Sequence, residues 1–114
     1  MDLAILRLKT MLEEAKIPFE YTEQFNTDRT VIRQVVLFGK DGRYLADCAQ
    51  GSFTHGSEMD LLEILNAVTD EERAFTGMTL GWLPVAEVFK RFKYCYENNT
   101  SVYKEEKNNG YGDY

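Results

Sequence analysis

The sequence predicts an α+β domain in which a three-stranded antiparallel sheet packs against helices, in the order α-β-β-β-α-α-α. Three strand-like segments joined by turns occupy residues 19 to 49, and the segments on either side repeat apolar residues at helical spacing. The chain has 114 residues, of which 44% are hydrophobic. That length and composition indicate one small domain with enough apolar side chains to form a core.

The first predicted helix covers residues 2 to 16. Asp2 is a suitable N-cap, and Pro18 ends the helix because the residue before a proline avoids the α region. One apolar stripe recurs at helical spacing: Ile5, Leu8, Leu12 and Ala15. Leu3 and Leu6 lie off this stripe, which predicts a second contact or a partly exposed apolar edge.

Three strands are predicted next, over residues 19 to 25, 30 to 38 and 43 to 49. The first alternates apolar and polar residues, as a half-buried strand does. The second is rich in β-branched residues and apolar on both faces, which is typical of a central strand. The run Gly39-Lys40-Asp41-Gly42 predicts the hairpin turn between the second and third strands.

Helices are predicted for the rest of the domain. Ser57 is expected to cap a helix that continues to about residue 68, and Thr69 to Glu72 form a capping box for a short helix that ends at Gly77. A loop, MTLGWL, follows, and Pro84 begins a long helix that ends near Asn98. We expect residues 1–98 to form the domain and residues 99–114 a flexible C-terminal tail.

The last predicted helix offers one candidate contact surface. At about 100° per residue its apolar positions fall within one arc, and Lys90 and Arg91 fall outside it. Tyr94 points nearly opposite the apolar arc, among those two cations, and an aromatic side chain flanked by cations is a plausible contact point. Trp82 is expected to hold the preceding loop against the core.

A second candidate surface is acidic. The segment from Glu58 to Glu72 contains six acids and no cation. These acids are Glu58, Asp60, Glu63, Asp70, Glu71 and Glu72. Carboxylates of this kind can occupy a basic groove, but acids also favour helix N-termini, where they complement the helix dipole. Both interpretations stay open at this point.

The sequence offers no catalytic site, no metal site and no cofactor motif. It has one histidine, His55, two distant cysteines, and neither a phosphate-binding loop nor a nucleophile elbow. The formal net charge of -6 opposes direct binding to nucleic acid or to an anionic membrane. No signal peptide is evident and the apolar runs are short, so we expect a cytoplasmic protein with reduced thiols.

Residues 58 to 103 carry a leucine-rich segment followed by T-x-E-E, G-W-L, E-V-F and Y-E-N-N. In this pattern, which covers under half of the chain, the sequence resembles small uncharacterised proteins of Firmicutes phages and mobile elements. The resemblance implies a phage or prophage accessory protein. Small acidic α+β proteins from that setting include type II anti-CRISPR proteins, some of which block the DNA groove of a nuclease with carboxylates.

Two hypotheses follow for function. The first is a non-enzymatic acidic protein-binding module that inhibits a host nucleic-acid-handling enzyme, in the manner of an anti-CRISPR protein, through its carboxylates. The alternative is a homo-oligomeric or small-ligand-binding domain that uses the aromatic C-terminal helix. In the alternative, the interface or pocket is lined by Leu3, Leu6, Trp82 and Tyr94.

Overall fold

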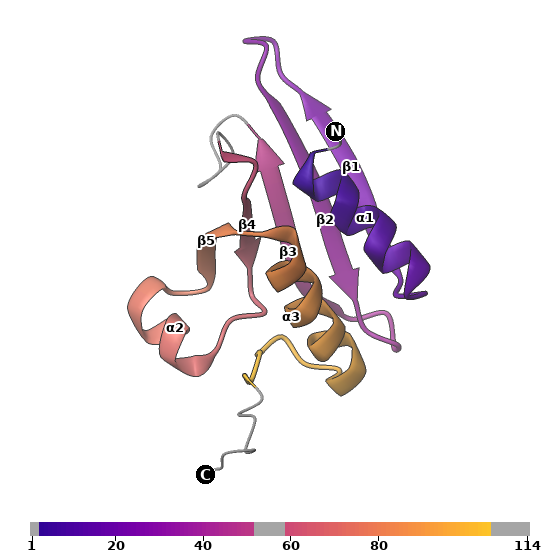
Figure 1. Ribbon diagram of the computed structural model, residues 1–114, viewed down its shortest axis with the longest axis vertical. Helices are drawn as coiled ribbons and strands as arrows, with labels where there is room; N and C mark the ends of the chain where they lie inside the picture. The colour runs from indigo at the N-terminus through magenta and orange to yellow at the C-terminus, as the bar shows by residue number, and fades with distance from the viewer. Residues whose placement is uncertain (1–2, 52–58, 106–114) are drawn as a thin grey trace.

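The computed structural model describes residues 3 to 51 and 59 to 105. The elements follow the order α1 (Ala4–Glu14), β1 (Phe19–Phe25), β2 (Val31–Phe38), β3 (Tyr44–Gly51), β4 (Leu62–Leu65), α2 (Asp70–Thr76), β5 (Thr79–Leu83) and α3 (Val85–Asn98). The strands form one antiparallel sheet in the order β1-β2-β3-β4-β5 (Figure 1). The predicted α+β class is confirmed, but the three-stranded sheet and the predicted element order are wrong.

The N-terminal half follows the prediction closely. Helix α1 buries Ile5, Leu8 and Leu12 completely, and β1 has the predicted bounds. The hairpin turn between β2 and β3 is also confirmed: Gly42 has φ 83°, and its N–H donates to the Gly39 carbonyl at 2.9 Å. Asp2, the predicted cap of the first helix, lies outside the described residues.

The helix predicted up to residue 68 is wrong for the described residues after 58, where the chain forms strand β4. Leu62 and Ile64 are buried and Leu65 is exposed, and Asp47 to Ala49 of β3 pair with this segment. Asn66 and Ala67 have φ values of 67° and 59°, which no α-helix accommodates. A short leucine-rich run is compatible with the repeat of a helix and with that of a strand. Here it forms a strand because it pairs with the edge of β3.

The loop predicted between the last two helices is wrong as well, because residues 79 to 83 form β5. This strand pairs Leu80 with Ile64 and Leu83 with Leu62. Two residues, Gly81 and Trp82, therefore occupy the length that Glu63 alone occupies on β4, which is a β-bulge. The bulge interrupts the two-residue alternation, so the sequence pattern of a strand is weak here.

Helix α2 confirms the predicted capping box. The Glu72 N–H donates to the Thr69 hydroxyl at 3.0 Å, and the Glu72 carboxylate accepts from the Thr69 N–H at 2.9 Å. The helix ends at Thr76, next to the predicted end at Gly77, and Gly77 has a positive φ of 72°.

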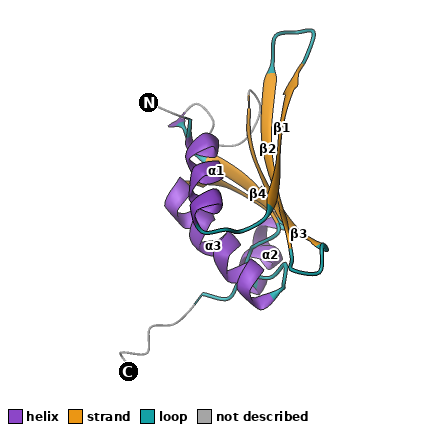
Figure 2. Ribbon diagram, turned by 90° about the vertical axis from the view of Figure 1, so that its right-hand side faces the viewer, coloured by secondary structure: helices purple, strands orange, loops and turns teal. Residues whose placement is uncertain are grey.

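The domain has two layers, shown edge-on in Figure 2. Helices α1 and α3 pack against each other and against one face of the sheet. The core between them includes Leu8, Val35, Cys48, Ile64 and Phe92, all at most 1% exposed. Among the described elements, no helix lies on the opposite face of the sheet (Figure 2).

The C-terminal segment packs back on the domain as far as the structure describes it. Tyr103 is only 3% exposed, and its N–H donates to the Val68 carbonyl at 3.0 Å. Val102 forms a parallel bridge with Val68. The packed part of the chain thus extends beyond residue 98, and residues 106–114 of the predicted tail lie outside the described residues.

Candidate functional site

The uncovered side of the sheet is called the open face here, and it follows from strand alternation. Side chains that pair across strands share a face, so the neighbours of the core-facing residues project to the other side. The open face consists of Glu20, Thr22, Gln24, Ile32, Gln34, Val36, Asp47, Ala49, Gly51, Glu63 and Leu65. These residues include three carboxylates and no Lys or Arg, so the face is negatively charged.

Asp47 holds a fixed position within the open face. Gln34 donates from its side-chain amide to Asp47 Oδ2 at 2.7 Å, and the Tyr44 hydroxyl donates to Oδ1 at 2.6 Å. Burial, together with the Asp47 carboxylate, raises the pKa of Tyr44 to about 12. The hydroxyl therefore stays protonated and keeps donating at neutral pH, so the carboxylate presents its charge in one orientation.

Apolar side chains lie between the carboxylates. Val36 pairs with Glu20 on one side and with Asp47 on the other, and Leu65, 37% exposed, pairs with Asp47. Strands lie about 4.8 Å apart, so Glu20 and Asp47, two strands apart, are separated by about 10 Å along the sheet. The open face therefore carries apolar side chains between carboxylates.

Of the six acids predicted to form a docking surface, Asp60 serves the fold. Its Oδ1 accepts from the Ala4 N–H at 2.9 Å and from the Gln50 amide at 2.8 Å, so it caps α1 from a distant part of the chain. These hydrogen bonds, first that from Ala4, lower the pKa of Asp60. Its oxygens are therefore engaged within the molecule.

Glu72 and Arg91 were predicted on separate contact surfaces, but the structure joins them. The two guanidinium Nη atoms of Arg91 donate to the two Glu72 oxygens at 2.7 and 2.8 Å, and Nε donates to Glu87 at 2.8 Å. The Arg91 side chain is only 7% exposed and stacks on the Tyr103 ring at 4.8 Å. The prediction that Arg91 lies on the solvated side of its helix is therefore wrong.

The remaining acids are dispersed. Glu63 belongs to the open face, while Asp70 and Glu71 are exposed in the first turn of α2. Asp70 and Glu71 line an open hollow of about 670 Å³ with Tyr103, Lys104 and Glu105. Glu58 lies outside the described residues. The structure thus does not gather the predicted acids into one surface.

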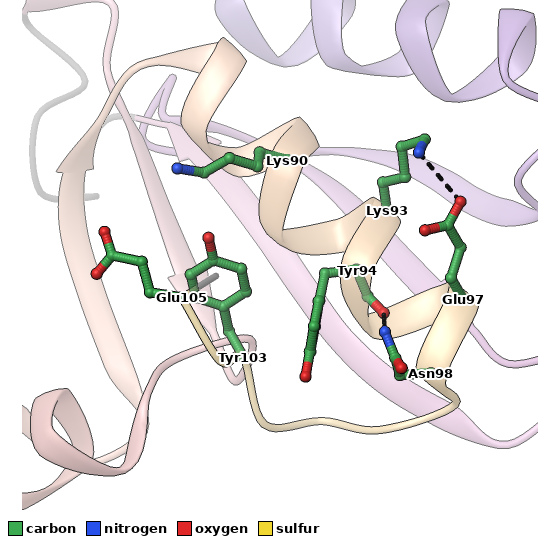
Figure 3. A pocket seen from close by; sticks show the side chains of 7 residues that line it. All are labelled: Lys90, Lys93, Tyr94, Glu97, Asn98, Tyr103 and Glu105. Atoms are coloured by element: carbon green, nitrogen blue, oxygen red, sulfur yellow. Dashed lines mark hydrogen bonds and ion pairs between the residues drawn. The ribbon is translucent and has the colours of Figure 1, made fainter. Parts of the chain in front are cut away.

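Lys90 and Tyr94 line a second open hollow, of about 510 Å³ (Figure 3). Tyr94 packs edge-on against Tyr103, with ring centroids 5.3 Å apart. Lys90 pairs with Glu87 at 3.2 Å and Lys93 with Glu97 at 3.0 Å, so both cations in the hollow already have carboxylate partners. The hollow therefore offers no surplus of positive charge for an anionic ligand.

Trp82 does not hold a loop against the core, contrary to expectation. It is 52% exposed, at the β5 edge of the sheet, and it has a left-handed φ of 63°. Leu3, the residue before α1, is 37% exposed. Trp82 and Tyr94 do not line a common hollow among those found in the described residues.

Within residues 3 to 51 and 59 to 105, no three His, Cys, Asp or Glu side chains come together in a way that would hold a metal ion. No helix in the same ranges has the length and apolar character needed to cross a membrane. Cys48 and Cys95 are both buried and unbridged, and burial raises the pKa of the Cys95 thiol to about 12.

Comparisons of the chain with protein-family models, curated proteins and solved structures found no match. The resemblance to phage and mobile-element accessory proteins therefore stays a prediction.

Sequence reasoning missed Glu20 and Asp47 as members of a candidate surface, and it placed Trp82 in a different one, with Leu3, Leu6 and Tyr94. A signal for the first two was present, because alternation in FEYTEQF and RYLADCA already places Glu20 and Asp47 opposite apolar residues. Trp82 had no such signal, since its strand pairs only with β4, which reads as a helix in the sequence.

Proposed function

We propose that this chain is a non-enzymatic protein-binding module whose open face docks on a basic surface of another protein. The observation that carries the proposal is the composition of that face: Glu20, Asp47 and Glu63 project from it with apolar side chains between them, and the described strand residues of the face include no Lys or Arg. Like-charge repulsion opposes the docking of a second copy through the same face, and phosphate groups would be repelled as well.

A host enzyme that handles nucleic acid is the class of partner that fits best. Such an enzyme concentrates Lys and Arg where it holds phosphates, and it would attract a rigid sheet that presents carboxylates. Occupation of that groove would inhibit the enzyme by competition. An anti-CRISPR-like role in a phage or mobile element is the narrowest form of this proposal, and it remains an analogy.

The proposal predicts salt-sensitive binding to a basic probe through the open face. Fluorescein-labelled nona-lysine and nona-arginine peptides serve as probes, with nona-glutamate as the negative control, and fluorescence anisotropy measures the Kd at low and high salt. The triple variant Glu20→Gln, Asp47→Asn, Glu63→Gln should bind about tenfold more weakly, since each exposed charge pair contributes about 0.2–1 kcal/mol.

A matched control removes the same charge elsewhere. The triple variant Glu13→Gln, Glu14→Gln, Glu97→Gln changes exposed acids on α1 and α3 and should keep nearly the wild-type Kd. Equal weakening in both triple variants would show that only net charge matters and would refute an open-face site. Circular dichroism spectra that match the wild type would exclude misfolding as the cause.

The alternative, a homo-oligomer or small-ligand binder that uses the aromatic C-terminal helix, has the hollow beside Tyr94 as its support. Sedimentation at high concentration tests the first form, because an oligomer would sediment faster than a monomer. A thermal-shift screen against nucleotides and metabolites tests the second. A monomer without a thermal shift would remove this alternative.

A further inference from the structure

We infer that Trp82 is the specificity-determining residue of the open face and stacks on an arginine guanidinium of the basic partner. The inference rests on the proposed function and names the chemical group that the surface selects. Trp82 is half exposed on β5, the last strand in the sheet order, and the bulge sets it with Gly81 opposite Glu63 of the open face. It is the only tryptophan in the chain.

The backbone fixes Trp82 in place. Leu80 and Leu83, on either side of the bulge, pair with β4 and pack against the core. Trp82 between them has φ 63°, a conformation that L-residues seldom adopt without a constraint from the surrounding structure. The ring is therefore carried by an anchored strand, so its presentation to a partner needs little further ordering.

In the part of the chain that the structure describes, three tyrosine rings have a cation from the same chain over them. Lys9 lies over Tyr21, Lys40 over Tyr96, and Lys90 and Arg91 over Tyr103. Within the described residues no Lys or Arg occupies the Trp82 ring, although tryptophan is the best ring for such a contact. A cation from the partner could lie over the Trp82 ring, as cations of this chain lie over the tyrosine rings.

The charge beside the bulge favours a cation too. Glu63 lies opposite Gly81 and Trp82 across the β4–β5 pairing, about 5 Å away at the backbone. A guanidinium is planar and weakly hydrated, so it can stack on an indole ring and lose little hydration. The ammonium of lysine is a compact, strongly hydrated charge and gains less from the ring. The site should therefore prefer arginine to lysine.

The test compares nona-arginine with nona-lysine, which carry the same charge, on the whole 114-residue chain. We expect nona-arginine to bind about two- to fivefold more tightly and to change the Trp82 emission at saturation. Trp82→Leu should remove this preference and keep the salt dependence. Trp82→Gly, which relieves the left-handed backbone, should behave in the same way and covers the case in which Trp82→Leu fails to fold.

Phe75→Leu is the matched control, because Phe75 is a 90% exposed aromatic residue on α2. It should keep the wild-type preference for arginine. Salt-dependent binding of both peptides with no arginine preference, or with a preference that survives Trp82→Leu, would overturn this inference and leave the proposed function standing. Failure of both peptides to bind would overturn the two together.

Discussion

The substitution Arg91→Met tests whether Arg91 belongs to the fold or to a contact surface. It removes a guanidinium that donates to Glu72, Glu87 and the Ala67 carbonyl. Loss of one partner from a buried ion pair costs about 3–5 kcal/mol, because the other charge is left without compensation. Here the Glu72 and Glu87 side chains keep 28% exposure and can be hydrated, so we expect a loss near the lower limit, about 3 kcal/mol.

Urea unfolding followed by circular dichroism and by Trp82 fluorescence measures this loss as a change in the free energy of unfolding. Lys93→Met is the control on the same helix, because its ion pair with Glu97 is exposed at 49% and 55%. Such pairs contribute about 0–1 kcal/mol, so this variant should unfold almost as the wild type does. Similar losses in the two variants would refute the assignment of Arg91 to the interior.

Three further predictions concern the remaining polar and thiol groups. Hydrogen bonding to Arg91 lowers the pKa of Glu72 below 4.5, so the contribution of the pair is complete above that pH and is lost as the pH falls through the folded-state pKa. The stability difference between the wild type and Glu72→Gln, measured with urea, should therefore shrink on acidification, and a constant difference would contradict this. Asp60→Gly should destabilise the domain by about 1 kcal/mol through loss of the α1 cap, whereas Asp60→Asn, which keeps an acceptor oxygen, should change the urea midpoint little. Cys48 and Cys95 are fully buried with raised pKa values, so a thiol reagent should modify them only as fast as the protein unfolds, and rapid labelling of the native chain would show otherwise.

The sequence did not predict which carboxylates share a face of the sheet. Glu63 was predicted as a member of an acidic surface, but the other carboxylates on its face of the sheet are Asp47 and Glu20, which precede it by 16 and 43 positions in the sequence. Asp60 and Glu72 have the same charge as Glu63, yet each is bound to a distant backbone or side-chain group. The positions of acids along the chain do not show which carboxylates form hydrogen bonds within the molecule and which lie on its surface.

Local patterns in the sequence determined α1, β1, β2, β3, the capping box of α2 and the position of α3. In each of these segments the periodicity or the capping residues act between near neighbours, so no distant contact is needed to specify them. Tertiary structure alone decided that Leu62 to Leu65 would be a strand, since the free edge of β3 binds it, and that β5 would follow as its partner. It also decided the burial of Arg91 and the exposure of Trp82, because both depend on elements that meet only after the chain has folded.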